Sequence, residues 1–292
     1  MRSIELPARG LDLAITAAPV AWGKGRWPSV DWIGGELVWC LPGDEGGRLI
    51  RVRQEEPERL RIDGFAERAE AEAWATRSLG WGAEPPALGE PVAARQLEAA
   101  PGLRPYASGS LVQGVLTAII GQSITVQAAA VTERRVAALY SAGQAYGGRT
   151  LYPFPPVEQL AATDPARLRE TGLTWRRAEA IVAIARIAAD GGILSDGAAR
   201  SAPEAALSAL RELPLVGPWT AASALLWGLG LDDAHPTGDV ALLRAARQAY
   251  AAPDMTLREL DRLAEQWRPA RAWAARALWL MLLGPAPETS RS

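Results

Sequence analysis

Helical spacing dominates this chain from about residue 100 onward and leaves few folds open. Apolar residues recur there every three to four positions, the period of an amphipathic helix. Residues that begin or end helices bound these stretches: Ser110 and Thr125 can cap two helices, and Gly121 follows the first. Helices joined by short loops bury their apolar faces against one another, so we predict an all-α array. Further helices are expected at 164–172, 175–190, from 203, at 218–227, at 239–250, after Thr256 and after Pro269.

The first 65 or so residues have a different pattern. Short apolar stretches alternate there with glycine-rich turns, which is typical of β-strands. A helical pattern follows at 67–79. We therefore predict a mainly α protein with a small N-terminal β-rich (α+β) unit at 1–85 and a helical region at 98–292. The strand-like stretches are residues 37–41, 49–52 and 60–62.

Charge and hydropathy limit where the protein acts. The chain of 292 residues has a net charge of −2, so it lacks a global basic signature for nucleic acid, although a local patch stays open. No run of about 18 uncharged apolar residues is present, and the N-terminus lacks a basic and then apolar signal segment. We expect a monomer in the bacterial cytoplasm, associated with the nucleoid and not with a membrane.

Two residue counts bear on cofactors and ligands. Cys40 is the only cysteine, which excludes an internal disulfide, an iron–sulfur cluster on four thiolates and a cysteine-based zinc site. We expect no required cofactor, Cys40 buried and inert, and oxygen ligands for any metal. The chain has 12 tryptophans, and so high a count favours some of them lining a cavity for a flat ligand.

Residues 213–221 predict two helices joined by a tight hairpin that contains Pro214 and Gly217, with Pro218 opening the second helix. Backbone amides at such a helix start bind anions, and a DNA phosphate fits without net positive charge. An ordinary corner between two helices has the same pattern. Taken alone, the hairpin leaves both interpretations open.

Asp239 begins a helix 20 positions after Trp219. The helix N-terminus and its capping amides keep such a carboxylate ionised. A lone aspartate at this position is better explained as a helix cap. The combination of hairpin, spacing and acid is what favours a catalytic role.

Together these features resemble the HhH-GPD superfamily of DNA glycosylases, and within it the bacterial 3-methyladenine DNA glycosylase II (AlkA-like) group. The similarity covers most of residues 98–283. It implies two helical lobes, roughly 108–230 and 98–107 plus 231–285, with an active-site cleft between them. The matching pieces are Pro101-Gly102-Leu103-Arg104-Pro105, Ala118-Ile119-Ile120-Gly121-Gln122, Gly172-Leu173, Arg176-Arg177-Ala178-Glu179-Ala180, the hairpin, Gly238-Asp239, Trp267-Arg268-Pro269 and Trp279.

The resemblance implies the chemistry of the site. Asp239 would be the catalytic carboxylate, which stabilises positive charge on the sugar, orients the attacking water, or does both. Bifunctional relatives have a Schiff-base lysine where this chain has Trp219, so a monofunctional hydrolase is implied. Trp279, Trp219 and Ser223 would line the base pocket, where aromatic rings attract cationic alkylated purines. Trp273, on another face of the same helix, would only pack.

The resemblance also assigns contacts to double-stranded DNA. The backbone carbonyls of Arg211, Leu213 and Val216 would ligate a sodium or potassium ion at the hairpin. Gln122 would lie beside the lesion. The full set of DNA contacts implied is Gln122, Ser123, Ile124, Val216, Gly217, Trp219 and Thr220.

Four positions depart from the family pattern. Leu215 replaces the first hairpin glycine, so the turn must tolerate a branched side chain or shift. Ser123 stands where relatives have an apolar wedge, which leaves Ile124 or another loop to fill the gap. Ser223 replaces a pocket aromatic and Gln113 replaces a frequent glutamate, which together would widen the pocket.

His235, the only histidine, is expected to be a solvated loop residue.

Three functions are compatible with these residues. The first is a glycosylase that flips an alkylated purine out of duplex DNA and hydrolyses its N-glycosidic bond. The second is a glycosylase for uracil, mismatched thymine or hypoxanthine. The third is a non-catalytic DNA-structure binder, which would gain nothing from a carboxylate beside phosphates.

Overall fold

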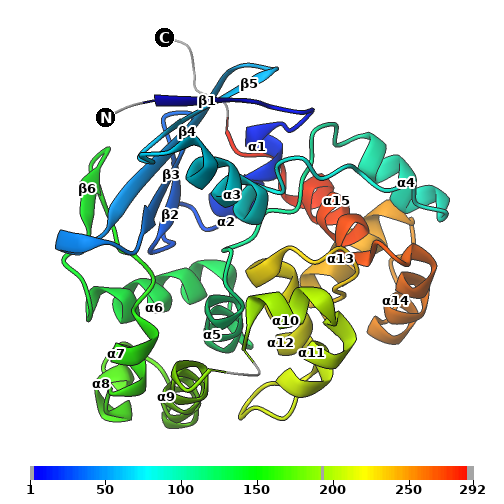
Figure 1. The fold of residues 1–292 in the computed structure, drawn as a ribbon. Coiled ribbons are helices and arrows are strands. Elements are labelled where there is room, and N and C mark those ends of the chain that lie inside the picture. The colour runs from blue at the N-terminus through cyan, green and yellow to red at the C-terminus, as the bar shows by residue number, and fades with distance from the viewer. Residues whose placement is uncertain (1–2, 192–193, 288–292) are drawn as a thin grey trace.

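The computed structural model describes residues 3–191 and 194–287 of the chain. It is mainly helical, with a small antiparallel sheet formed by the N-terminal part (Figure 1), as the sequence predicts. The five strands lie in the order β1-β5-β4-β3-β2. Their bounds are β1 Ser3–Pro7, β2 Val30–Ile33, β3 Glu36–Leu41, β4 Arg48–Glu56 and β5 Arg59–Asp63.

The sheet is buried on both faces. Consecutive residues of β3 are apolar, and their side chains point alternately to one face and the other. Leu37 and Trp39 face the core beneath helix α3 (Arg68–Leu79), where Trp39 meets Trp74 edge to face at 5.6 Å. Val38 and Cys40 face the opposite side. Cys40 is buried as expected, and burial raises its thiol pKa to about 12.

A two-stranded hairpin, β6 (Gln144–Tyr146) with β7 (Arg149–Leu151), covers that opposite face. It belongs to the part of the chain predicted to be all-α, so this part of the prediction is wrong. The strands have only three residues each, which is too short to show an alternating pattern. The hairpin therefore ties the helical region to the N-terminal sheet.

The expected helices form, with their caps in place. Helix α5 (Leu111–Gly121) begins with the Ser110 hydroxyl accepting from the Gln113 amide, and α6 (Val126–Ala138) begins at Thr125 in the same way. The remaining helices of this region are α4 Pro91–Glu98, α7 Val157–Ala161, α8 Pro165–Arg169, α9 Trp175–Ala189, α10 Asp196–Ser201, α11 Pro203–Leu210, α12 Pro218–Ala224, α13 Val240–Ala249, α14 Leu257–Ala264 and α15 Arg271–Leu283; the N-terminal part adds α1 Leu13–Thr16 and α2 Ala18–Trp22.

Helix α12 does not end at Trp227 as predicted but continues as a π-helical turn, Leu225–Leu229. Gly228 in this turn meets Gly114 of α5, and a Cβ on Gly114 would lie only 2.8 Å from the Gly228 Cα. The two helices therefore cross with their backbones in contact. This crossing fixes α12 against the core, and α12 carries the hairpin at its start.

Trp273 and His235 are two residues whose surroundings the sequence predicted. Trp273 of α15 is buried and its indole nitrogen donates to Asp232 at 2.8 Å, so its predicted packing role is confirmed. His235 is not solvated: it is 7% exposed and its Nε2 lies 3.0 Å from the Asp261 carboxylate. His235 does lie in the loop before α13, but the prediction that it is solvated was wrong, because the ring packs edge-on against Trp267. None of the described helices is both long and apolar enough to cross a membrane.

Candidate active site

The hairpin between α11 and α12 closes through its backbone. The Val216 amide donates to the Leu213 carbonyl at 3.1 Å, and Leu215 between them has a φ of +61°. The turn thus keeps the left-handed geometry that suits glycine, although a leucine stands there. Gly217 follows as the exposed cap residue before Pro218. An amide-rich turn is therefore presented to solvent at the start of α12.

Asp239 lies beside this turn and caps α13. One carboxylate oxygen accepts from the Leu242 amide at 2.7 Å, and the other accepts from the Trp219 indole nitrogen at 2.9 Å. Trp219 is the second residue of α12, so the indole joins the acid to the helix that begins at the hairpin. Asp239 is partly exposed. It is a helix cap and also an accessible carboxylate, so the two interpretations left open by the sequence are compatible.

The loop after α5 is tied to the hairpin. The Gln122 side-chain amide donates to the Leu215 carbonyl at 2.8 Å and to the Thr220 hydroxyl at 2.9 Å. Arg177 of α9 donates to the Gln122 carbonyl from the other side. These bonds hold the predicted lesion-side loop at the edge of the hairpin. They also engage Thr220, which is buried with its hydroxyl on Gln122, so that hydroxyl faces inward.

The next two residues of this loop stand out from the surface. Ser123 has a φ of +57°, and Ile124 is 40% exposed. Both residues lie in the short loop between α5 and α6. Of the two predicted wedge positions, Ile124 therefore presents the larger apolar surface to a ligand.

A row of side chains follows one face of α12 and the π-helical turn: Trp219, Ser223 and Trp227. The four-residue spacing places them on one side of a helix. Trp227 stacks on Trp279 of α15 with ring centres 5.3 Å apart and an angle of 30° between planes. Ser223 and Trp279 are buried at 3% and 4% exposure. Trp219 and Ser223 thus share the face of α12 that begins beside Asp239, and Trp279 joins this face through its contact with Trp227.

Trp227 was not among the predicted site residues. Its spacing from Trp219 was a usable signal, because positions i, i+4 and i+8 share a helix face. Arg276 of α15 was also not among the predicted residues; its guanidinium carbon lies 4.6 Å from the centre of the Trp227 ring. A single arginine within the apolar stretch 272–283 was the signal for it.

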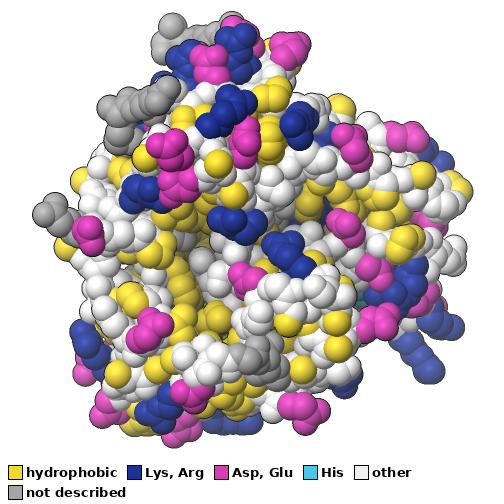
Figure 2. Space-filling view, viewed as in Figure 1, with side chains coloured by type: hydrophobic (Ala, Val, Ile, Leu, Met, Phe, Trp, Pro, Cys, Tyr) yellow, Lys and Arg dark blue, Asp and Glu magenta, His cyan; other side chains and the backbone are white. Residues whose placement is uncertain are grey.

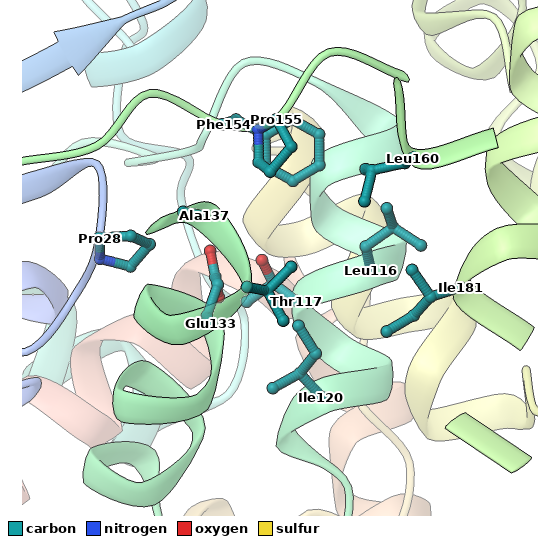
Figure 3. Close-up of a pocket in the computed structure, with 11 residues that line it drawn as sticks. Pro28, Leu116, Thr117, Ile120, Glu133, Ala137, Phe154, Pro155, Leu160 and Ile181 are labelled. Carbon is teal, nitrogen blue, oxygen red and sulfur yellow. The ribbon is translucent and has the colours of Figure 1, made fainter. Parts of the chain in front are cut away.

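A separate crevice lies between α5 and α6 and is closed by Pro28 and Phe154 (Figure 3). Glu133 and Thr117 point into it from the two helices. Glu133 is 6% exposed, and burial raises its carboxyl pKa to about 7, although a hydrogen bond from Thr117 acts in the opposite direction. The crevice has no residue of α12, α13 or α15, so it is distinct from the row that begins at Asp239.

Charge is mixed on the face of the molecule that Figure 2 shows. Figure 2 shows acidic and basic side chains scattered over one face, with no patch of a single sign. Among the described residues no group of three or more histidine, cysteine, aspartate or glutamate side chains could hold a metal ion. Any attraction of this face for a phosphate would thus depend on local amides and single arginines.

Comparison with known proteins gives one family match. A family model described as "HhH-GPD superfamily base excision DNA repair protein" matches residues 116–269. DNA-3-methyladenine glycosylase 2 of Escherichia coli is 35% identical over 198 residues, which cover 66% of this chain and 64% of that protein. A probable bifunctional transcriptional activator/DNA repair enzyme AlkA of Mycobacterium tuberculosis is 32% identical over 271 residues, covering 90% of this chain and 49% of that protein. The chain spans under two thirds of the first relative and about half of the second.

Solved structures share the fold at lower identity. A 3-methyladenine DNA-glycosylase from Archaeoglobus fulgidus has a TM-score of 0.77 at 21% identity, covering 96% of this chain and 97% of that one. An 8-oxoguanine glycosylase/lyase of Clostridium acetobutylicum, solved with double-stranded DNA, has a TM-score of 0.74 at 17% identity, covering 96% and 94%. These similarities concern the fold and extend over nearly the whole length of the chain.

Proposed function

The chain belongs to the HhH-GPD superfamily of base excision DNA repair proteins, and from this premise we propose that it is a monofunctional DNA glycosylase. It would flip a damaged purine out of duplex DNA and hydrolyse the N-glycosidic bond, with alkylated purines as the first substrate class. The observation that carries the proposal is the hydrogen bond between Asp239 and Trp219. It places the one candidate acid directly beside the hairpin that would hold a backbone phosphate.

Asp239 suits the chemistry of base departure. Leaving of the base develops positive charge on the sugar, which a nearby carboxylate stabilises. A carboxylate has about four acceptor sites, and the Leu242 amide and the Trp219 indole use two of them. The others remain for the attacking water or for the sugar. The two fixed N–H groups also orient the carboxylate before substrate arrives.

Hydrolysis without strand cleavage follows from the residue beside the acid. Lyase chemistry in relatives needs an amine that forms a Schiff base, and an indole nitrogen cannot do so. Trp219 occupies that position, and Lys24 is the only lysine of the chain. The product would be an abasic site with an intact backbone.

DNA would be held at the hairpin through its backbone. The amides of Gly217 and Trp219 would bind a phosphate, and Ile124 in the loop after α5 would fill the space that the flipped nucleotide leaves. The carbonyls of Arg211, Leu213 and Val216 are the hard oxygen donors that a sodium or potassium ion prefers. The Leu213 carbonyl already accepts the Val216 amide, which leaves it one lone pair for an ion.

A panel of duplex oligonucleotides tests the proposal. Each duplex has one lesion: 7-methylguanine, 1,N6-ethenoadenine, hypoxanthine, uracil or thymine opposite guanine. The full chain is expected to release at least one damaged purine and to leave alkali-labile sites that are uncut before alkali. Strand cleavage without alkali, with an adduct trapped by borohydride, would contradict a monofunctional enzyme. DNA binding without release of any base would support the non-catalytic alternative.

A separate measurement tests the proposed sodium or potassium ion at the hairpin. DNA affinity is compared in potassium, sodium and tetramethylammonium chloride at one ionic strength, because the bulky organic cation cannot enter a ring of carbonyls. We expect tighter binding in the potassium or sodium salts. Equal affinity in all three would remove the ion from the proposal.

A further inference from the structure

Trp175, the first residue of α9, is exposed as no other tryptophan of the chain is. All 12 tryptophans lie in the described ranges, and the others are buried or half-buried, whereas Trp175 is 51% exposed. A large flat ring gains much from burial, so tryptophan is enriched where a protein surface meets a partner. Its exposure here points to a surface that a ligand covers.

Trp175 belongs to a group of exposed apolar side chains around the candidate active site. In the part of the chain that the structure describes, five large apolar side chains are exposed, and four of them form this group: Ile124, Val126, Trp175 and Val240. Val240 directly follows Asp239. The fifth, Leu283, is at the end of α15. Single exposed apolar residues are ordinary, but a group of them beside one site marks a binding surface.

The loop after α5 connects Trp175 to the hairpin. The Gln122 side-chain amide donates to the Leu215 carbonyl of the hairpin, and the Gln122 backbone carbonyl accepts from Arg177. Arg177 is two residues after Trp175, and its amide donates to the hydroxyl of the cap residue Thr174. The hairpin and the start of α9 therefore flank the loop on opposite sides.

Arg169 holds one face of the Trp175 ring. Its guanidinium carbon lies 5.3 Å from the ring centre, and its Nη1 donates to the Leu173 carbonyl at 3.2 Å. A guanidinium covers one face only, so the other face is left for a second flat group. Residues 167–179 contain four arginines and two glutamates in a chain of net charge −2, so this segment is locally basic. A nucleobase beside its phosphates fits such a surface.

We propose that Trp175 stacks on the orphaned base, the one opposite the lesion, an inference that rests on the glycosylase function proposed above. The hairpin would hold the damaged strand beside Asp239, and Ile124 would fill the gap. The complementary strand then lies beyond the loop, where α9 begins. When the damaged nucleotide leaves the stack, its partner base loses a pairing partner, and an aromatic ring can stabilise it by stacking. Trp175 would thus contribute to DNA binding and not to bond cleavage.

Binding to two duplexes that cannot be cleaved tests the proposal. Both have a tetrahydrofuran abasic analogue at the lesion position; it faces adenine in the first duplex and a second abasic analogue, with no orphaned base, in the other. Trp175→Ala should weaken binding to the first duplex by about tenfold, the value of one stacked base, and to the second by less than about twofold. Trp175→Phe keeps a ring and should stay within a few-fold of the unaltered protein. Leu283→Ala, at the exposed position outside the group, is the matched control and should change neither affinity.

The outcomes separate this inference from the function on which it rests. If the unaltered protein releases no base and binds neither abasic duplex more tightly than an undamaged one, the glycosylase proposal fails. If it does both, and Trp175→Ala weakens the two duplexes equally or weakens neither, only the inference about Trp175 fails.

Single-turnover base release at saturating enzyme is the second readout. Trp175→Ala should keep this rate within about twofold, because a group that only binds DNA does not act on the chemical step. A much larger loss would overturn a role confined to binding. Circular dichroism checks folding; should Trp175→Ala not fold, Trp175→Leu, which is apolar without a ring, replaces it with the same expected results.

Discussion

Asp239 and Glu133 are two carboxylates of the same helical region in opposite surroundings. Asp239 begins a helix, is partly exposed and accepts an N–H bond on each oxygen. Glu133 lies within α6, is buried, and has one oxygen without a partner. An accessible carboxylate held by fixed donors can act on a substrate, whereas a buried one that retains its proton cannot supply charge to a cleft. The two carboxylates therefore differ in their access to solvent and in the hydrogen-bond donors around them, and not in the chemistry of the carboxyl group.

The largest expected effect is on the Asp239 side of this comparison. Asp239→Asn should lower base release by about 10³-fold, because a neutral amide does not stabilise positive charge on the sugar. Asparagine can keep the bond from the Leu242 amide but turns its NH2 group toward the Trp219 indole, so the free energy of unfolding should fall by about 1 kcal/mol. Single-turnover base release and DNA affinity are measured together, and affinity should be unchanged or higher. Undiminished release would place the catalytic acid elsewhere.

Glu133 should show the converse behaviour, with a change in stability and none in chemistry. The folded protein keeps the proton of Glu133 up to a pKa of about 7, whereas an unfolded chain loses it near the ordinary value of 4.5. Between these values the folded state binds more protons, so stability falls as pH rises. The loss is on the order of 3 kcal/mol between pH 4.5 and 7. Urea unfolding at a series of pH values measures it.

Glu133→Gln is the matched variant, since it keeps the shape without the charge. Its unfolding free energy should lack this fall between pH 4.5 and 7, and its rate of base release at pH 7 should equal that of the unaltered protein. An unchanged pH slope would mean that Glu133 does not titrate as described. A large loss of activity would break the distinction between the two carboxylates.

A smaller effect concerns the donor that holds Asp239. Trp219→Phe removes the indole N–H and should slow base release by about tenfold, the value of one hydrogen bond to a charged group. Trp273→Phe is the control, because its indole bonds Asp232 outside the row. We expect that variant to lose stability but to keep its rate per folded molecule. Equal effects in the two variants would show that the Trp219 bond has no catalytic value.

The smallest effect is at the hairpin turn. A leucine at a φ of +61° destabilises the folded state by about 1–2 kcal/mol relative to glycine. Glycine also has a more flexible unfolded chain, which lowers the free energy of unfolding by about 0.4–1 kcal/mol. Leu215→Gly should therefore stabilise the protein by about 0.5 kcal/mol and leave DNA affinity unchanged. Thermal unfolding measures it. Clear destabilisation would mean that the leucine side chain has a packing role that exceeds the strain.

Much of the fold and the acid of the site could be predicted because their signals are local. Ser110, Thr125 and Asp239 start helices through bonds to amides within three residues, which the sequence alone specifies. His235 could not be placed, because its burial comes from Trp267 and Asp261, which lie 26 or more positions away. The hairpin β6–β7 was missed because its strands are too short to have a periodicity.

By itself the sequence determined that helices follow a small β-rich unit, that the hairpin precedes Pro218, and that Asp239 begins a helix, since caps, glycines and periodicity act over a few residues. Only the tertiary structure decided that Trp219 bonds Asp239, that Arg276 lies over Trp227, and that Glu133 is buried. Each of these depends on how separate helices pack. Burial and charge pairing are properties of that packing, and no spacing along the chain encodes them directly.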